Sequence, residues 1–303
     1  MQAALFDLTD DAGAGDGTMA PEPFKMQLLK WIGNKQRFGH EIASYFPADY
    51  RCYYEPFLGS GGVLGVVAPH TGVGSDAFGP LVGIWQCLHD DPAQLVEWYR
   101  TRWERFQAGA ATVEGRTAAY EAIKADYNAM PNAADLLFLS RSCYGGVVRF
   151  RKDGYMSTPV GVHNPVSPES FKQRAAEWAR RTAGCRFEQL DYREAIDRAG
   201  EGDIVYCDPP YTDTQKILYG AQAFSLPDLC EHIAAAKRRG ARVALSIDGT
   251  KRSGSHTVQL PIPDGLFERE AMVNCGISHL RRFQRGGETL GDELVSDRLL
   301  LTW

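Results

Sequence analysis

A short apolar segment that runs into two consecutive prolines constrains this chain more than any other feature. Residues 203–207 (Asp-Ile-Val-Tyr-Cys) predict a buried strand, and Asp208-Pro209-Pro210-Tyr211 follows directly. In open α/β sheets ligands bind beyond the carboxyl ends of the strands, so we expect Asp208 to face a crevice. The prolines fix the backbone and remove two N–H donors, which leaves a carboxylate and carbonyls as rigid acceptors. These acceptors suit a planar amino group, and Tyr211 offers a flat face to a ring; the alternative is a tight turn with a purely structural role.

A glycine-rich turn follows the first strand that the sequence predicts. Residues 52–55 form that strand, and residues 56–62 (Pro-Phe-Leu-Gly-Ser-Gly-Gly) come next, where glycines let a ligand approach the backbone. The spacing does not match G-x-G-x-x-G, because Leu64 and Val66 stand where the last glycine would be. This argues against a dinucleotide dehydrogenase. Asp76 ends the next expected strand, where such folds place the acid that binds a ribose hydroxyl; a turn residue is the alternative.

The middle of the chain predicts helices, and the last third returns to strands. Asp91-Pro92 and Ser167-Pro168 are typical helix starts, and the first is followed by apolar residues at helical spacing. Further on we expect a helix from Ser225 to Gly240, a strand at 242–247, glycine- and arginine-rich loops, and a final strand at 297–302. The fold class is therefore α/β, a sheet interrupted by a mostly helical insertion. The domains that we expect are a flexible acidic tail at 1–23, a sheet domain at 24–87 plus 183–303, and the insertion at 88–182.

The charge of the chain is unevenly distributed. The formal net charge is −5, and residues 1–22 contain five acidic residues and no Lys or Arg, so the tail accounts for all of it. Residues 141–186 contain nine basic and three acidic residues. This local excess is typical of a surface that binds phosphates, although a solvated basic face explains it equally well.

The cysteines and histidines argue against a metal site or a disulfide framework. Both residue types occur seven times, and they are scattered along the chain without C-x-x-C or H-x-x-x-H. We therefore expect reduced thiols and no metal. The sequence also has no apolar run of about 18 residues that would span a membrane and no signal peptide, so we expect a cytoplasmic protein that does not contact membranes.

A third motif, Lys30-Trp31-Ile32-Gly33-Asn34-Lys35, would by itself predict only the start of an amphipathic helix. The three motifs together, in this order and with an insertion between the second and the third, resemble the Dam-like (alpha-class, D-P-P-Y) family of DNA adenine-N6 methyltransferases. The resemblance covers residues 25–303. It implies a Rossmann-like S-adenosylmethionine-dependent methyltransferase sheet with an inserted target-recognition (DNA-binding) domain. The residues that it implies in binding S-adenosylmethionine are Trp31, Lys35, Phe57, Gly59, Gly61, Asp76, Asp191 and Asp208.

The resemblance extends to the basic middle segment. Residues 141–149 (Arg-Ser-Cys-Tyr-Gly-Gly-Val-Val-Arg) and 156–161 (Met-Ser-Thr-Pro-Val-Gly) are similar to the DNA-reading part of the family. Gly145 stands where the members that methylate GATC have asparagine, so the resemblance does not carry over that specificity. The residues implied in contacting double-stranded DNA are Tyr144, Arg149, Arg151, Lys152 and Pro159.

The reaction that the resemblance implies is methyl transfer from S-adenosylmethionine to N6 of a flipped adenine in duplex DNA, with Asp208, Pro209 and Tyr211 as catalytic residues. Three alternatives remain: an RNA methyltransferase that shares D-P-P-Y, a cytosine-N4 enzyme, which more often has serine in place of Asp208, and a non-catalytic DNA-binding regulator on the same fold. The sequence does not give the recognition site or the oligomeric state. A cognate restriction nuclease is a partner that it neither requires nor excludes.

Overall fold

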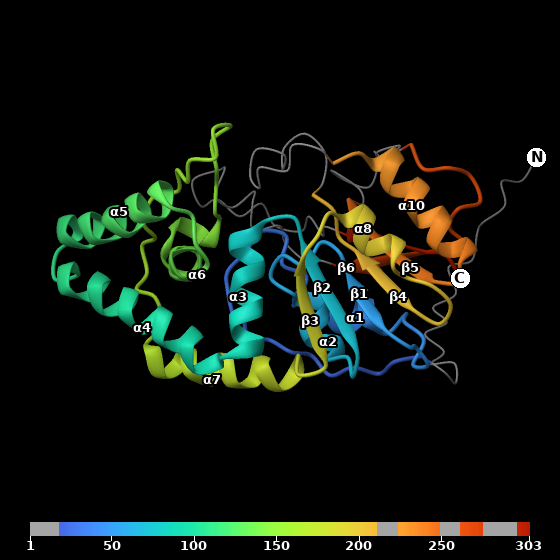
Figure 1. Ribbon diagram of the computed structural model, residues 1–303, viewed down its shortest axis with the longest axis horizontal. Helices are drawn as coiled ribbons and strands as arrows, with labels where there is room; N and C mark the ends of the chain where they lie inside the picture. The colour runs from blue at the N-terminus through green and yellow to red at the C-terminus, as the bar shows by residue number, and fades with distance from the viewer. Residues whose placement is uncertain (1–17, 211–223, 249–260, 275–295) are drawn as a thin grey trace, which may run out of the picture.

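The computed structural model describes residues 18–210, 224–248, 261–274 and 296–303. Its centre is a seven-stranded sheet with the order β3-β2-β1-β4-β5-β7-β6 (Figure 1). The first five strands in this order are parallel, and β7 is antiparallel to both of its neighbours. The strands are β1 (Tyr53–Glu55), β2 (Gly72–Asp76), β3 (Cys185–Gln189), β4 (Ile204–Cys207), β5 (Arg242–Asp248), β6 (Arg269–Asn274) and β7 (Ser296–Leu301).

The strand order confirms the predicted α/β class and locates its ligand-binding edge. β1 pairs with β2 on one side and with β4 on the other, so the connections from β1 and from β4 leave in opposite directions. Ligands of open α/β sheets bind at such a switch point, outside the carboxyl ends of the strands. The glycine-rich turn follows β1 and Asp208 follows β4, so both predicted motifs lie at this edge.

Helices cover both faces of the sheet. They are α1 (Gly39–Ala43), α2 (Gly62–Val67) and α3 (Gly79–Asp90) on one face, and α8 (Tyr192–Asp197) and α10 (Leu226–Arg238) on the other. Alternate residues of β4 pack on opposite faces of the sheet. Ile204 and Tyr206 lie in the core on the face covered by α1, α2 and α3, and Val205 and Cys207 lie in the core on the face covered by α8 and α10. Both faces are therefore buried, which explains why β4 is apolar throughout.

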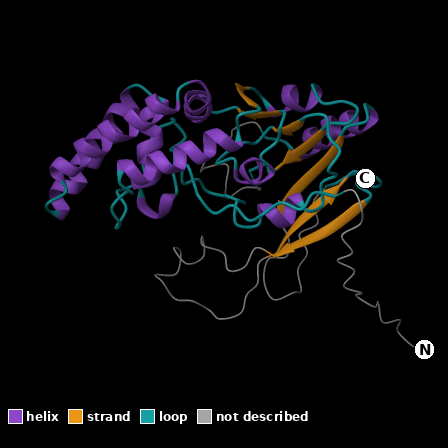
Figure 2. Cartoon of the chain, turned by 90° about the horizontal axis from the view of Figure 1, so that it is seen from below, coloured by secondary structure: helices purple, strands orange, loops and turns teal. Residues whose placement is uncertain are grey.

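The predicted insertion consists of helices that lie beside the sheet. These are α4 (Pro92–Gly109), α5 (Val113–Ala129), α6 (Ala133–Ser142), the 3₁₀ turn η1 (Tyr144–Gly146) and α7 (Pro168–Arg181). Figures 1 and 2 show α4, α5 and α6 together at one end of the molecule and the strands at the other. The predicted helix starts are confirmed, because the side chains of Asp91, Ser167 and Ser225 each accept a backbone N–H of the first turn.

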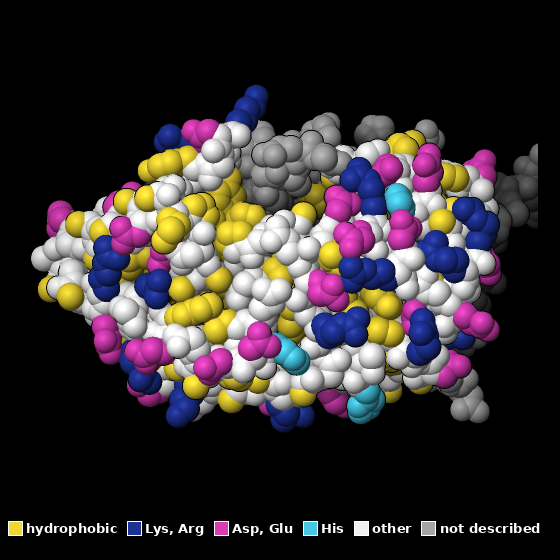
Figure 3. Space-filling model, viewed as in Figure 1, with side chains coloured by type: hydrophobic (Ala, Val, Ile, Leu, Met, Phe, Trp, Pro, Cys, Tyr) yellow, Lys and Arg dark blue, Asp and Glu magenta, His cyan; other side chains and the backbone are white. Residues whose placement is uncertain are grey.

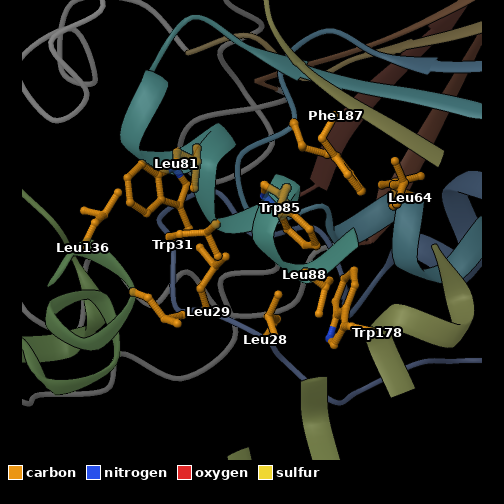
Figure 4. Close-up of a cluster of buried hydrophobic side chains, with 14 of the residues drawn as sticks. Leu28, Leu29, Trp31, Leu64, Leu81, Trp85, Leu88, Leu136, Trp178 and Phe187 are labelled. Atoms are coloured by element: carbon orange, nitrogen blue, oxygen red, sulfur yellow. The ribbon is translucent and has the colours of Figure 1, made fainter. Parts of the chain in front are cut away.

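A continuous apolar core joins these helices to the sheet. Trp85 of α3 and Trp178 of α7 meet edge to face with ring centroids 5.2 Å apart, and both are fully buried. Figure 4 shows them with Leu28 and Leu88 in the same cluster. The predicted start of the insertion at residue 88 therefore falls inside α3, a helix that packs against β3.

Two further predictions differ from the structure. Residues 269–274 lie in the segment expected to be loops, but they form β6. Contacts with the body of the molecule begin before the predicted end of the tail, because Met19 N–H donates to Phe46 O at 2.9 Å. Among the described helices, none is long and apolar enough to cross a membrane.

Candidate active site

A cavity of about 330 Å³ lies at the carboxyl ends of β1, β2 and β4. This volume is within the range of small-molecule sites. Its walls come from all three sequence motifs, from the last residue of β2 and the two residues after it, and from the cap of α8. Among the lining residues are eight that the sequence singled out: Trp31, Lys35, Phe57, Gly59, Asp76, Asp191, Asp208 and Pro209.

Gly59 and Asp76 connect two edges of the cavity. The backbone N–H of Gly59 donates to one carboxylate oxygen of Asp76 at 3.1 Å, and the N–H of Phe78 donates to the other at 3.0 Å. Burial raises the pKa of Asp76, and the backbone N–H groups partly offset this effect. A carboxylate oxygen accepts more than one hydrogen bond, so Asp76 keeps acceptor capacity for a ligand hydroxyl.

Glycine is required at position 59 for two reasons. Its φ is +48°, in the left-handed region, and a Cβ there would lie 3.3 Å from the indole of Trp31. Gly61 also has a positive φ, +61°, but a Cβ there would meet the ring of Trp85, and Gly61 is not among the residues that line the cavity. Glycine at position 61 thus makes room for the ring of Trp85, and the contact with the cofactor that the sequence predicted for Gly61 stays a prediction.

Aromatic rings form two walls of the cavity. Trp31 stacks on Phe78 with centroids 6.3 Å apart, and Phe57 stacks on Tyr192 with centroids 5.2 Å apart. Phe224 packs edge to face against Phe57. Flat apolar walls of this kind suit a planar ring system. Asp191 lies nearby as the N-cap of α8, where its side chain accepts the N–H of Arg193 at 2.9 Å.

Asp208 is held by a buried lysine. Lys35 Nζ lies 3.1 Å from Asp208 Oδ1 and 3.2 Å from Asp297 Oδ2. Burial alone would lower the pKa of Lys35, but the two carboxylates outweigh it and hold the pKa above its ordinary value. Lys35 is therefore a permanent cation in the cavity wall.

Glu55 is a functional candidate that the sequence reasoning did not single out. It ends β1, is almost fully buried, and accepts a hydrogen bond from Tyr53 Oη at 2.7 Å. Burial raises its pKa to about 8, and the charge of Asp208 adds to the increase. Glu55 thus lines the site as a neutral acid at neutral pH. The available signal was its position, since it is the last residue of an apolar strand that enters the glycine-rich turn.

The structure brings the predicted DNA-contacting residues to one exposed region. Tyr144, Arg149, Arg151, Lys152 and Pro159 are all exposed. The N–H of Tyr144 donates to Pro159 O at 2.8 Å, which joins the two stretches of sequence. A bridge between Phe150 and Met156 closes a hairpin-like loop, and next to this bridge the guanidinium of Arg151 lies 4.6 Å from the ring centre of Tyr155.

Gly145 has a φ of +65° in this region. Glycine and asparagine are the residues that adopt this conformation most readily. Glycine at position 145 therefore allows the same turn that asparagine would, without a polar side chain on this exposed surface.

The nine basic residues of 141–186 do not form one phosphate-binding face. Arg141 is buried and donates to the carbonyls of Gln27 and Leu28, and Arg174 also donates to Gln27 O. Arg180 and Arg181 pair with Glu177. On the face shown in Figure 3, basic and acidic side chains are interspersed. The local charge excess is thus partly structural, and the exposed cations that remain near Tyr144 are Arg149, Arg151 and Lys152.

Comparison with known proteins accounts for this arrangement of motifs. The model of the D12 class of N6 adenine-specific DNA methyltransferases matches residues 31–252, which is most of the chain. The chain belongs to this family. The predicted family resemblance is confirmed, and the sheet is the Rossmann-like methyltransferase sheet that the motifs implied.

Relatives of this D12 family member carry matching names at modest identity. The chain is 28% identical to the DNA N-6-adenine-methyltransferase of Escherichia phage P1 over 75% of this chain and 30% of the phage protein. It is 29% identical to the retron Ec67 DNA adenine methylase of Escherichia coli, over 62% of this chain and 64% of that protein. A DNA adenine methylase of Vibrio cholerae is 26% identical over 77% of this chain and 83% of that protein. The chain thus spans less than two thirds of the length of the phage and retron relatives.

The family and the fold imply S-adenosylmethionine as the methyl donor, and the residues present fit this molecule. The cavity has the size of a small-molecule site, its aromatic walls suit an adenine ring, and Asp76 retains acceptor capacity for ribose hydroxyls. A side chain at position 59 would enter the cavity beside Trp31.

Proposed function

We propose that this protein transfers a methyl group from S-adenosylmethionine to N6 of a flipped adenine in duplex DNA. The observation that carries the proposal is the position of Asp208 and Pro209 in the wall of the same cavity as Asp76 and the glycine-rich turn. The acceptors proposed for the target amino group, Asp208 and Pro209, thus lie next to the residues proposed to bind the cofactor.

The geometry of the cavity supports the cofactor-binding roles that we propose. Asp76 accepts the ribose hydroxyls, the N–H groups of Gly59 and Phe78 hold its carboxylate, and Trp31 and Phe57 provide apolar walls. Asp191 and Lys35 complete the polar part of the lining. When bound, S-adenosylmethionine supplies an electrophilic methyl group.

Asp208 and Pro209 act on the target base. The carboxylate of Asp208 and the carbonyl of Pro209 accept the two amino hydrogens, so the nitrogen lone pair is directed at the methyl group. Tyr211, which lies outside the described residues, stacks on the base in this proposal. Extruding the base costs a few kcal/mol, which stacking and backbone contacts offset. Catalysis is then mainly positioning and electrostatics, because the reaction is a direct displacement.

DNA binding is the role that we propose for the helical segment at 88–182. Arg149 reads a base edge, Arg151 and Lys152 contact phosphates, and Tyr144 and Pro159 contact the duplex beside them. Phosphate contacts position a protein on DNA, whereas base contacts give specificity. All five residues are exposed, which supports their contact with DNA. The protein would act in the cytoplasm, where genomic DNA is accessible. A cognate nuclease would be its partner, and methylation would protect DNA against cleavage by that nuclease.

Product analysis tests the proposal against its alternatives. Purified protein is incubated with labelled S-adenosylmethionine and duplex DNA or RNA, and the modified nucleosides are identified by mass spectrometry. We expect N6-methyldeoxyadenosine from duplex DNA. Label in RNA alone would indicate an RNA methyltransferase, N4-methyldeoxycytidine would indicate a cytosine enzyme, and DNA binding without any label would indicate a regulator.

A further inference from the structure

Asp297 does not itself line the candidate active site and belongs to none of the three motifs, but it contacts the site through Lys35, which does line it. Its Oδ2 is 3.2 Å from Lys35 Nζ, and the same ammonium is 3.1 Å from Asp208 Oδ1. All three side chains are largely buried, with exposed fractions of 9% for Lys35, 13% for Asp297 and 16% for Asp208. The ammonium of Lys35 is thus shared by the carboxylates of Asp208 and Asp297, which lie far apart in the sequence.

The position of Asp297 is fixed by the sheet. It lies in β7, where its backbone pairs with Val273 on one side and with Asp248 on the other. A strand held on both sides cannot shift without breaking its ladder hydrogen bonds, so Asp297 anchors Lys35 to the rigid part of the fold. Asp208, by contrast, comes directly after the end of β4, and in the proposed function it contacts the target base.

The shared ammonium also sets the charge of the site. Asp208 and Asp297 carry two negative charges and Lys35 one positive charge, so the three groups together are negative. Glu55, Tyr53 and Tyr206 also face this region, and burial raises the pKa of each, so they are neutral at neutral pH. Without the charge of Asp297 the ammonium would neutralise Asp208 alone, and the group would have no net charge.

We propose that Asp297 is a positioning residue for methyl transfer, which holds Lys35 between two carboxylates and so keeps Asp208 oriented and negative toward the amino group. The proposal rests on the function proposed above. As the N6 lone pair forms the new N–C bond, the S–C bonding pair returns to sulfur. The nitrogen becomes positive until it releases a proton to water. A net negative group beside that nitrogen stabilises this charge, and an acceptor fixed in advance needs no reorganisation.

A double-mutant cycle between Asp297→Asn and Lys35→Met tests the proposal. Asparagine keeps the size of the side chain and an oxygen acceptor but removes the charge. We expect Asp297→Asn to lower the single-turnover methylation rate about tenfold to a hundredfold, the range for loss of one charged hydrogen bond. The dissociation constants for S-adenosylmethionine and for DNA should change less than about twofold. In the Lys35→Met background, Asp297→Asn should lower the rate no further.

Asp203→Asn is the matched control. Asp203 is also a buried aspartate in an ion pair, 2.6 Å from Arg51, but it lies directly before the start of β4, at the end of the strand away from the cavity. It should lower the free energy of unfolding and leave the single-turnover rate unchanged. The unfolding free energies of the Asp297 and Lys35 variants are measured as well, since they report the ion pair without any need for activity. We expect the effects of the Asp297 and Lys35 substitutions on the free energy of unfolding to be coupled as well.

Three results would overturn the proposal: a wild-type rate in Asp297→Asn, losses of rate that add in the double variant, or an equal loss in Asp203→Asn. A wild-type protein that methylates no substrate would instead refute the proposed function, and this role of Asp297 with it. That outcome is recognisable because the unfolding cycle would still show the ion pair.

Discussion

Gly59 and Asp76, which follow β1 and end β2, are joined by a hydrogen bond of 3.1 Å from the glycine N–H to the aspartate carboxylate. This bond ties the glycine-rich turn to the acid that we assign to ribose binding. The turn and the acid therefore form one unit, and removing the carboxylate affects both.

Asp76→Ala should weaken binding of S-adenosylmethionine without changing the DNA site that is modified. Loss of a charged hydrogen bond typically removes about 1.5–3 kcal/mol, which is roughly a tenfold to hundredfold loss of affinity. Calorimetric titration measures this directly, with unfolding by urea as a control for the loss of the Gly59 contact. An unchanged dissociation constant would refute the ribose assignment.

Glu55 should make the protein less stable as the pH rises. Its pKa is raised to about 8 in the folded state, so between about pH 4.5 and 8 the folded protein keeps a proton that the unfolded chain has lost. The free energy of unfolding should therefore fall by up to ~1.4 kcal/mol per pH unit in this window from this group alone.

Glu55→Gln removes this titration while keeping an acceptor for Tyr53 Oη. The stability of the variant relative to the wild type should increase from pH 5 to pH 8 and then level off. Urea unfolding at a series of pH values provides the measurement. A difference that does not vary with pH would show that Glu55 titrates normally.

Arg149 and Lys152 should differ in how their removal affects DNA recognition. A guanidinium that donates two bonds to guanine discriminates by ~1–3 kcal/mol, so Arg149→Ala should relax selection at one base pair. Lys152→Ala should weaken binding to all duplexes and lower the salt slope by about one unit. Methylation of a panel of singly substituted duplexes at fixed salt separates the two. A uniform loss for Arg149→Ala across the panel would make Arg149 a phosphate contact.

Arg141→Met should act on stability and leave the salt dependence of DNA binding unchanged. Arg141 is buried and donates to two main-chain carbonyls ahead of Trp31, so its loss leaves acceptors unpaired. We expect a decrease of about 2–4 kcal/mol in the free energy of unfolding. Lys152→Ala serves as the opposite control, since it should change the salt slope and barely affect stability. A lower salt slope in Arg141→Met would show that Arg141 contacts phosphates.

The sequence predicted the cavity well because its walls come from local motifs at strand ends. Asp76, Gly59 and Asp208 are each adjacent to a strand that periodicity identifies, and the carboxyl ends of parallel strands share one edge. The role of Asp297 could not be found in this way. It meets Lys35 only because β7 is inserted between β5 and β6, which is a property of the whole sheet.

The elements that were missed lack the periodicity on which the predictions depend. All but the first residue of α6 are buried, so the helix has no polar face to mark it. β6 begins with Arg269 and Glu270 and exposes Met272, so apolar residues do not alternate regularly with polar ones. The charge excess of 141–186 could not be assigned to one surface for a related reason, because composition does not distinguish a buried arginine such as Arg141 from an exposed one such as Arg149.

The single-turnover rate of N6 methylation in Asp208→Asn tests the role of Asp208 at the reacting amino group. The substitution keeps the size of the side chain and an oxygen toward Lys35, but it removes the negative charge that we place at the reacting amino group. With duplex DNA and saturating S-adenosylmethionine, the account predicts a rate at least about a hundredfold below that of the wild type, with the protein still folded and still binding both ligands. A variant that keeps more than a few per cent of the wild-type rate would contradict the account.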